Sequence, residues 1–536
     1  MKKLVMKKFF NNSRFSEGSV SSVGVFLLLC IYPFVFSNGY SDITYTRFMF
    51  FCLVSIVIFA ICIIYYLKKT SSVGTEIRKS FSTATVTDKA FLSFFISTLA
   101  AFAFSEYKYA SLIGDLGRYM GFVMFFSIFL MYIWVSRFYT LKERDMKFFC
   151  IAGVCIAVFS FLQFEGVDLF GFLKSIPFER RKNFLSPFGN INVFASFLSV
   201  AAPFTMYMFC FNPEKKKNVF FYGVVCAANF ISVLISNSDS VYAMIAVVWI
   251  VLFILSCRNK EAFVRFFILC TIFFGASIFF AVIFYMVRGT RGLSTLTHTY
   301  INSILPFLGI GISFVLYFLF SKKAPSERTL KKVQKIAIAS VLICFSVIMG
   351  CIVYFTRFDT VTDLGSFNGY FRFTDSWGTD RGYVWTRLIR IFGNASLKEK
   401  IFGFGEDTVS VVLIENYLSE MRSQLGYLFD NAHNEYLHYL ITIGLFGLGS
   451  YLAILSSTFL SYKKHKLNVM QKALLLSVVG YMVQSGFNII QPISTPFIFI
   501  TVALIRCRCE DTNSTIVNTK NTFDKVEEGG IKNENV

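Results

Sequence analysis

Charged residues are scarce in this chain of 536 residues, because Asp, Glu, Lys and Arg together make up only 16% of it. Soluble globular proteins carry about 25%, so this shortfall excludes an ordinary soluble enzyme. Proline is also rare, with 9 residues, whereas hydrophobic residues reach 55% and Phe alone numbers 68. A chain so apolar is not disordered over most of its length, and it points to a membrane protein.

Long apolar runs are what the chain has in abundance. A helix needs about 20 apolar residues to cross a hydrocarbon layer about 30 Å thick, because its backbone groups must bond one another there. Fourteen such runs occur, and no charged residue lies inside any of them. They predict fourteen transmembrane helices, at 20–36, 48–67, 90–104, 120–136, 148–164, 191–211, 219–235, 241–257, 266–287, 301–320, 336–355, 436–460, 473–488 and 489–505.

Lys and Arg on alternate loops predict the orientation, since positive residues are retained on the cytoplasmic side. With the N-terminus inside, the inner segments carry 35 of them and the outer segments carry 17. This predicts a multi-pass protein of the cell membrane with both termini cytoplasmic. The insertion rule also explains the net charge of +20, so we expect no nucleic-acid partner. The expected regions are a cytoplasmic segment 1–19, helices 1 to 11 within 20–355, a large outer loop 356–435, helices 12 to 14 within 436–505 and a cytoplasmic tail 506–536.

The outer cations differ in kind from the inner ones. Twelve of the 17 outer cations are Arg, against nine of the 35 inner ones. Lys is enough for topology, whereas the planar guanidinium grips phosphate or carboxylate oxygens at two points. For any single Arg, binding of an anionic ligand and pairing with an outer acidic residue both remain open. None of the 13 Cys lies in an outer loop, and no spaced Cys and His set occurs, so we expect neither disulfides nor a metal there.

The outer segment 356–435 is long enough to fold outside the membrane. Residues 381–392 place apolar residues at helical spacing and predict an amphipathic helix of the kind that lies at the headgroup level, with Arg387 on its other face. A second helix is expected at about 410–425. The segment ends in Asp430-Asn-Ala-His433-Asn434-Glu435, at the start of the twelfth predicted helix. An imidazole there can accept a proton from a hydroxyl, with Asn434 orienting it, but a structural role for His433 also remains open.

Several of these elements resemble the O-antigen ligase and O-antigen polymerase superfamily. His433-Asn434-Glu-Tyr-Leu, followed by Gly-Leu-Phe-Gly-Leu-Gly, resembles its HN-x-x-L motif and the Gly-rich helix that this motif opens. Arg381-Gly-Tyr-Val-Trp385 and the Phe-Gly-Phe-Gly of 402–405 resemble its R-x-x-x-W and F-G-x-G elements. Gly-Asn190-Ile-Asn192 resembles its G-N-P-N element, with Ile in place of Pro, and 112–121, which contains Arg118, resembles its outer Gly/Arg segment. The resemblance covers roughly residues 90 to 505.

The apolar runs predict an all-α polytopic membrane helical bundle of about 14 transmembrane helices, or 12 to 14, with one large extracytoplasmic loop that contains amphipathic helices. The resemblance implies that this bundle is GT-C-like. It implies a glycan transferase that moves or polymerises a glycan from undecaprenyl diphosphate onto a hydroxyl of a glycan or lipid, with inversion. His433 matches the family's proposed general base, and no cofactor is implied. Arginines take the place of a metal in stabilising the departing diphosphate. The expected clamp is Arg118, Arg180 or Arg181, and Arg381, with support from Asn190, Asn192, Asn434 and Trp385.

Two other classes remain open. A flippase or exporter of lipid-linked glycans would use outer Arg for headgroups, although the chain shows neither a clean internal repeat nor an intramembrane charge. A cell-wall polymerase of the shape-and-division type would depend on an outer Asp such as Asp375, Asp380 or Asp430 in place of His. Within the favoured family the sequence does not separate a ligase from a polymerase, since both need the same donor and base. The chain exceeds the family's usual helix number, and we place the extra pair within 266–355.

Overall fold

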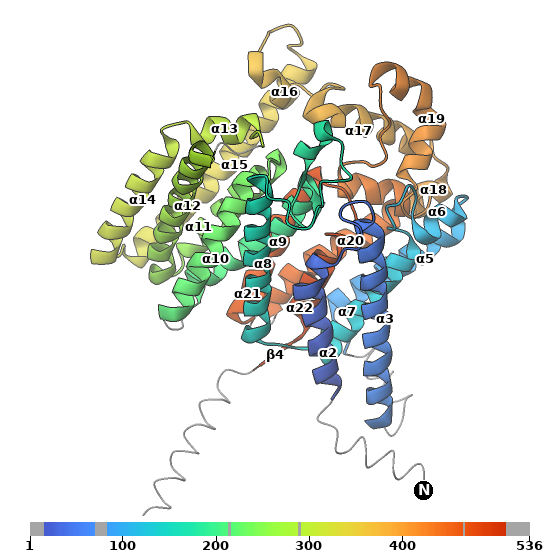
Figure 1. Cartoon of the computed structure of the whole chain (residues 1–536), viewed down its shortest axis with the longest axis horizontal. Helices are drawn as coiled ribbons and strands as arrows, with labels where there is room; N and C mark the ends of the chain where they lie inside the picture. The colour runs from blue at the N-terminus through green and yellow to red at the C-terminus, as the bar shows by residue number, and fades with distance from the viewer. Residues whose placement is uncertain (1–15, 70–82, 213–215, 288–290, 465–466, 511–536) are drawn as a thin grey trace, which may run out of the picture.

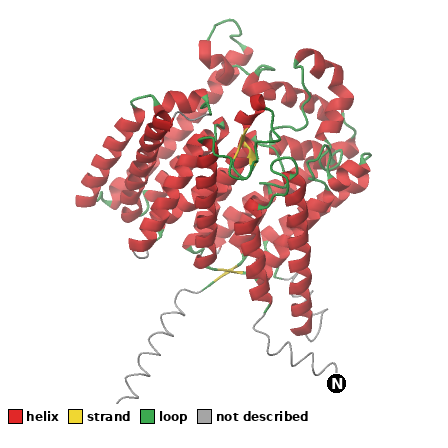
Figure 2. Ribbon diagram, in the orientation of Figure 1, coloured by secondary structure: helices red, strands yellow, loops and turns green. Residues whose placement is uncertain are grey.

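The computed structural model of the chain describes residues 16–69, 83–212, 216–287, 291–464 and 467–510. Residues 1–15 of the expected N-terminal segment and 511–536 of the expected tail lie outside the described residues. So do Arg288, an arginine of a predicted outer loop, and His465, one of the four histidines. Helices dominate the described part, and the strands in it are only two residues long (Figure 2). β1 (Thr140–Leu141) pairs in parallel with β4 (Arg508–Cys509), and β2 (Phe184–Leu185) pairs antiparallel with β3 (Gly189–Asn190).

Each of the fourteen apolar runs overlaps a helix. Among the described residues, eleven helical segments are long and apolar enough to cross a membrane. They are α2 (Glu17–Phe26) with its continuations η1 (Leu27–Ile31) and η2 (Tyr32–Phe34), α3 (Ile43–Lys69), α5 (Val86–Phe104), α8 (Glu143–Phe164), α9 (Ile191–Phe211), α10 (Lys216–Ile235), α11 (Asp239–Ser256), α12 (Lys260–Val287), α14 (Leu305–Lys322), α15 (Glu327–Arg357) and α20 (Glu435–Lys464). Three shorter helices fill the remaining runs, namely α7 (Phe122–Phe138), α21 (Val469–Gln484) and α22 (Pro496–Arg506). The chain is therefore a polytopic helical membrane protein, while the count of fourteen spans stays a prediction.

The remaining helices are short or lie in the connections. They are α6 (Lys108–Ile113), η3 (Phe178–Asn183), α13 (Thr295–Ile301), η4 (Gly365–Phe367), α16 (Asn368–Phe371), α17 (Trp377–Asn394), α18 (Leu397–Phe402), α19 (Val409–Gln424) and η5 (Ser485–Phe487). Figure 1 shows α16, α17 and α19 gathered at one end of the molecule, with β4 and the start of α2 at the opposite end.

Helix α9 forms the centre of the bundle, and its apolar stretch is entirely buried. Small residues on both sides let α21 approach it closely. A Cβ added to Gly480 of α21 would lie 2.6 Å from the carbonyl oxygen of Ser199, and the Ser477 hydroxyl donates to the Val200 carbonyl at 2.7 Å. Such small-residue contacts are how helices pack in lipid, where the hydrophobic effect does not drive them together.

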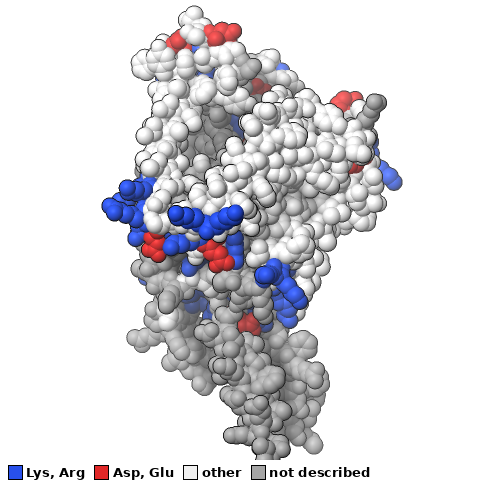
Figure 3. Space-filling model, turned by 90° about the vertical axis from the view of Figure 1, so that its left-hand side faces the viewer, with Lys and Arg blue, Asp and Glu red and all other residues white. Residues whose placement is uncertain are grey.

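Helices α14 and α15 lie at the edge of the bundle, within the region where the extra pair is predicted. None of the apolar window of α15 is buried, and Leu330 is its one buried residue. The side that these helices present in Figure 3 is largely uncharged, with Lys and Arg gathered along its lower edge. This separation of charge is what the positive-inside rule leads us to expect at one membrane surface.

The segment 356–435 folds into helices with an apolar cluster of their own. Tyr383, Val384 and Leu388 of α17 are fully buried against residues of α19 and α20, such as Leu413 and Ile441. The amphipathic helix is thus present, but its apolar face packs against protein and is not free to lie at the headgroup level. Periodicity identifies an apolar face without identifying what covers it.

Candidate active site

A kink in α20 joins the Gly-rich segment 402–405 to the helix that follows His433. Gly444 has φ 67° and ψ −171° inside this helix, so the regular hydrogen-bond ladder is interrupted. The freed carbonyls of Ile441 and Thr442 accept the N–H groups of Phe404 and Gly405 at 3.0 and 2.9 Å. The two glycine elements recognised in the sequence are therefore parts of one backbone contact.

The segment 114–121, which carries Arg118, closes around the residues after that contact. One Asp407 oxygen, Oδ2, accepts the N–H groups of Asp115 and Met120 at 3.2 and 3.4 Å. The Ser111 hydroxyl donates to Glu406 Oε2 at 2.5 Å. These bonds join residues almost 300 positions apart and bring Arg118 to the start of α20.

A tight turn presents His433. Asn431 is fully buried, and its Oδ1 accepts the His433 N–H at 3.1 Å while His433 adopts φ +48°. The Asn434 side chain accepts the N–H of Leu437 at 3.0 Å, as an N-cap residue does, so it begins α20. Trp385 donates its indole N–H to the Ala432 carbonyl at 2.9 Å. Asn434 and Trp385 thus both hold the turn that carries His433.

Arg118 and Arg381 are the two predicted arginines that reach this turn. Arg118 is buried, and its Nη2 lies 2.5 Å from Asp430 Oδ1. Arg381 donates Nη1 to the Gly378 carbonyl at 2.9 Å. Nε and Nη1 of Arg118, Nε of Arg381 and Nδ1 of His433 are all buried without a hydrogen-bond partner among the described residues. Buried polar groups are rarely left unpaired, and the arginine N–H groups of this set are suited to an anionic ligand.

The surroundings keep His433 neutral. Burial lowers the pKa of its imidazole most, the positive charges of Arg381 and Arg118 lower it further, and Asp430 opposes them, with a result of about 3. Burial also lowers the pKa of the Arg381 guanidinium, against the attraction of Asp239. A neutral imidazole beside two cations with free N–H groups can accept a proton where an anion binds.

Of the other predicted residues, Arg180 and Arg181 lie in η3, whereas Asn190 and Asn192 lie at the start of α9. Arg180 is exposed, and Arg181 donates Nε to the carbonyl of Ile176 in its own segment. Asn190 caps α9 by accepting the N–H of Asn192, whose Oδ1 accepts the Ser238 hydroxyl at 2.7 Å. The structure therefore brings Arg118, Arg381, Trp385 and Asn434 to His433, and it places the residues of the 180–192 segment in contacts of their own.

Several other arginines of the predicted outer loops pair with protein groups. Arg387 is buried and pairs with Asp375 and Glu420, both at 2.6 Å, although its helical position predicts a polar face. Arg47 donates Nη2 to the carbonyls of Pro33 and Pro187 at 2.5 and 2.6 Å. Arg291 and Arg372 also donate to backbone carbonyls. Backbone carbonyls are thus a third kind of partner, besides the ligand and the acidic residues that the sequence leads us to expect.

Two buried acids near Arg118 are not among the residues selected from the sequence. Burial raises the pKa of Glu406 to about 8, against the hydrogen bond from Ser111. Burial raises the pKa of Asp407 to about 7, against Arg118 and two backbone N–H groups. Their position directly after the Phe-Gly-Phe-Gly element is a signal in the sequence, but it does not indicate that they are buried.

Glu406→Gln is expected to reduce the pH dependence of stability. The folded-state pKa of Glu406 lies above its unfolded value, so its contribution is fully present below about pH 4 and is lost as pH rises through about 8. The melting temperature of the purified variant, measured from about pH 5 to 9, should exceed that of the wild type by about 2 to 4 °C at the alkaline end only. Glu106→Gln, at an exposed position, is the matched control. Parallel pH profiles for Glu406→Gln and the wild type would contradict the prediction.

Backbone strain gathers around the same loops. Eight non-glycine residues in the described part have positive φ, and all of them lie in predicted outer loops. They are Leu116, Tyr119, Ser186, Asn237, Thr379, Asp380, Asp407 and His433. Such conformations cost of order 1 to 3 kcal/mol each and cluster at functional sites. Among the same described residues, no group of three or more His, Cys, Asp or Glu is arranged to hold a metal ion.

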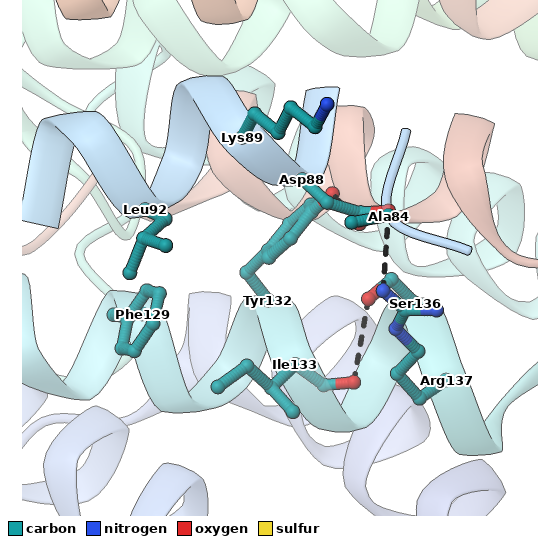
Figure 4. A pocket seen from close by; sticks show the side chains of 9 residues that line it. All are labelled: Ala84, Asp88, Lys89, Leu92, Phe129, Tyr132, Ile133, Ser136 and Arg137. Carbon is teal, nitrogen blue, oxygen red and sulfur yellow. Dashed lines mark hydrogen bonds and ion pairs between the residues drawn. The ribbon is translucent and has the colours of Figure 1, made fainter. Parts of the chain in front are cut away.

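A separate cavity of about 250 Å³ lies between α5 and α7 and shares no residue with the His433 site. Figure 4 shows Asp88 and Tyr132 among its lining residues, together with Arg137. Asp88 binds Arg137 at 3.1 Å and Arg506, at the end of α22, at 3.3 Å. This cluster joins three helices near β4, and its charged groups already pair with one another.

The described part thus combines a polytopic helical membrane bundle with a buried, cation-rich histidine turn. Residues 291–452 match the model of the O-antigen ligase family, which confirms over this region the resemblance predicted from the sequence. The match includes Arg381, Trp385, His433 and Asn434 and leaves Arg118 and Asn190 outside it. The chain matches none of the curated proteins compared with it. The family indicates a membrane enzyme of the glycan ligase or polymerase kind.

Proposed function

We propose that the chain transfers a glycan from a polyprenyl diphosphate, such as undecaprenyl diphosphate, to a hydroxyl of a second glycan or lipid. The single observation that supports this most is the convergence of Arg118 and Arg381 on His433, with buried and unpaired N–H groups on both guanidiniums. A diphosphate offers the charge and the oxygens that such donors lack. The cell membrane, with this site on the outer side, is the proposed location.

In the proposed reaction the acceptor hydroxyl gives its proton to the His433 imidazole as its oxygen attacks the anomeric carbon. The bond from that carbon to the diphosphate oxygen breaks, and the electron pair leaves with the diphosphate. Attack opposite the leaving group inverts the anomeric configuration. Arg118 and Arg381 stabilise the charge that develops on the diphosphate, which is work that a divalent cation does in other transferases.

The other predicted residues have proposed supporting roles. Asn434 and Trp385 hold the turn through Leu437 and Ala432. Arg180 and Arg181 are proposed to meet the donor from the 178–183 segment. Asn190 is proposed to support the 184–190 hairpin, and Asn192 the start of α9. Of the four clamp candidates, Arg118 and Arg381 have the stronger support, because they act electrostatically on His433.

Transfer is expected to continue in a metal chelator. The assay uses the purified chain in lipid nanodiscs with an oligosaccharide on polyprenyl diphosphate and a glycan acceptor, and it measures released polyprenyl diphosphate with and without EDTA. Because arginines are proposed to stabilise the leaving group, turnover should stay within about two-fold of the untreated sample. A strict requirement for added Mg²⁺ or Mn²⁺ would argue against the arginine clamp.

Deletion of the gene that encodes this chain distinguishes a ligase from a polymerase. Shortened surface glycans in the deletion strain would indicate a polymerase. Full-length glycans that accumulate on polyprenyl diphosphate would indicate a ligase. Unchanged surface and lipid-linked glycans would count against both proposals.

A further inference from the structure

The ion pair between Arg118 and Asp430 joins a buried cation to a much more exposed anion. The side chain of Arg118 is 8% exposed, whereas that of Asp430 is 48% exposed, and Nη2 and Oδ1 are 2.5 Å apart. Removing the partner of a buried cation is costly unless another anion replaces it. An exposed carboxylate, in contrast, can return to water at little cost. The pair can therefore exchange its anion without moving its cation.

Asp430 also belongs to the loop that presents His433. It lies three positions before His433, and between them the buried Asn431 fixes the backbone of His433. Phe429 packs edge-on against the imidazole with ring centres 5.8 Å apart. A side-chain rotation of Asp430 therefore leaves the position of His433 unchanged. Asp430 already attracts the protonated form of His433, since it opposes the two arginines.

The charges around His433 come from several elements. Arg118 faces it from the segment after α6, Arg381 faces it from α17, and Asp430 lies on its own loop. Further out, Asp407 faces Arg118 from the loop before α19, and Asp239 faces Arg381 from the start of α11. Burial lowers the basicity of the imidazole most, and the two nearest cations, which outweigh the one nearby anion, lower it further. The imidazole is therefore a poor proton acceptor at neutral pH until the charge of those cations is neutralised.

We propose that the donor diphosphate takes the place of Asp430 on Arg118, and that the released Asp430 carboxylate then becomes the partner of the protonated His433. This inference rests on the proposed function, because it concerns the same donor and base. The diphosphate neutralises both arginines as it binds, so His433 gains basicity only when the donor is present. During transfer the proton of the acceptor hydroxyl moves to the imidazole, the glycosidic bond to the diphosphate breaks, and Asp430 pairs with the imidazolium until the products leave. Asp430 is thus a positioning residue that acts through Arg118 and His433.

The exchange is measurable without any transfer reaction. The chain has only four His, so ¹⁵N-histidine labelling gives four imidazole signals, and the His433→Asn variant assigns the one that matters. In the wild type, saturating farnesyl diphosphate should raise the pH at which His433 titrates by about one unit or more, while the exposed His298 should not respond. Farnesol, which lacks the diphosphate, is the ligand control. An unchanged His433 titration with bound farnesyl diphosphate would overturn the proposal.

Asp430→Asn separates positioning from folding. Without the competing carboxylate, farnesyl diphosphate should bind about five-fold more tightly and the KM for a lipid-linked donor should fall. Without the carboxylate partner, kcat should fall about ten-fold or more and its acidic limb should move to lower pH. Asp430→Glu should restore the wild-type acidic limb. Loss of kcat with an unchanged KM and acidic limb, or equal diphosphate affinity, would mean a structural role only.

The two proposals fail in different ways. If farnesyl diphosphate shifts the His433 titration but no lipid-linked glycan is transferred, the proposed function fails and the exchange stands. If transfer occurs while the titration and the Asp430→Asn affinity are unchanged, the exchange fails and the proposed function stands. The wild-type titration does not depend on Asp430→Asn, so poor folding of that variant leaves the test intact.

Discussion

His433→Asn is expected to lower glycan transfer by about 100- to 10,000-fold while the protein stays folded and inserted in the membrane. This range is the usual contribution of a general base. Asparagine suits the position because His433 has φ +48°, a conformation that asparagine adopts more readily than most residues. The backbone bond to Asn431, which fixes the turn, does not depend on the imidazole. Turnover of a purified lipid-diphosphate glycan measures the effect.

The matched control is His298→Asn, which changes an exposed histidine in α13 that is also predicted to lie on the outer side. It should transfer glycan at the wild-type rate, and both variants should melt within about 2 °C of the wild type. If His433→Asn kept more than a tenth of wild-type turnover, the general-base assignment would be wrong. Loss of transfer together with early melting of His433→Asn would instead indicate a structural role for His433.

Gly444→Ala is expected to destabilise the folded chain by about 3 kcal/mol or more, because a glycine at this position permits a close backbone contact. A Cβ there would lie 2.3 Å from the carbonyl oxygen of Ile401, and the residue has φ +67°. The nearest atoms are backbone, so they cannot rotate away, and the left-handed conformation adds its own cost for alanine. Gly403 lies on the other side of the same contact, and a Cβ added to it would lie 2.2 Å from the carbonyl oxygen of Thr442. Gly403→Ala is therefore expected to have a similar effect. Thermal aggregation in detergent measures both variants.

Gly449→Ala is the control in the same helix. Nothing lies within 4 Å of a Cβ added there, so the substitution should be neutral or should stabilise α20 by up to about 1 kcal/mol. Gly444→Ala and Gly403→Ala should also lose transfer. The contact at 441–444 positions the residues that lead to Asp407, and Asp407 binds the segment that carries Arg118. A Gly444→Ala protein with the wild-type melting temperature would contradict the close backbone contact.

The positions of the membrane helices could be predicted because each depends on its own residues. The run 191–211 has the same bounds as α9, since polar residues flank it on both sides and Asn190 supplies the cap. The last two runs were predicted less well. The regular helix in the apolar run 489–505 is α22, which has only 11 residues and ends at Arg506, one position past the run. It begins at Pro496, a residue suited to a helix start. Local rules therefore place helices well and place their ends less well.

Part of the site could also be predicted. His433, Arg381 and Trp385 lie in motifs of one segment, and the structure brings them together. Glu406 and Asp407 could not be selected, because their burial comes from Ser111 and the N–H groups of 115 and 120, almost 300 positions earlier. The apolar face of residues 381–392 was predicted, but its cover of α19 and α20 residues was not. Helical periodicity identifies the apolar face but does not identify the residues that pack against it.

The sequence by itself determined that this chain is apolar enough for a polytopic membrane protein and that it carries motifs resembling the O-antigen ligase family. It also predicted an arginine-rich outer side and a histidine at the start of a late helix. Apolar runs, charge bias and short motifs are local, so one chain is enough to recognise them. Only the tertiary structure decided which arginines of the predicted outer side reach His433 and which bind protein groups elsewhere. Arg47, Arg291 and Arg372 bind backbone carbonyls, and Arg387 binds two acids. Every residue carries a carbonyl, so no sequence pattern marks the ones that engage a guanidinium. Arg118 and Arg381 keep unpaired N–H groups beside His433 because the folded loops around them leave those donors without an acceptor.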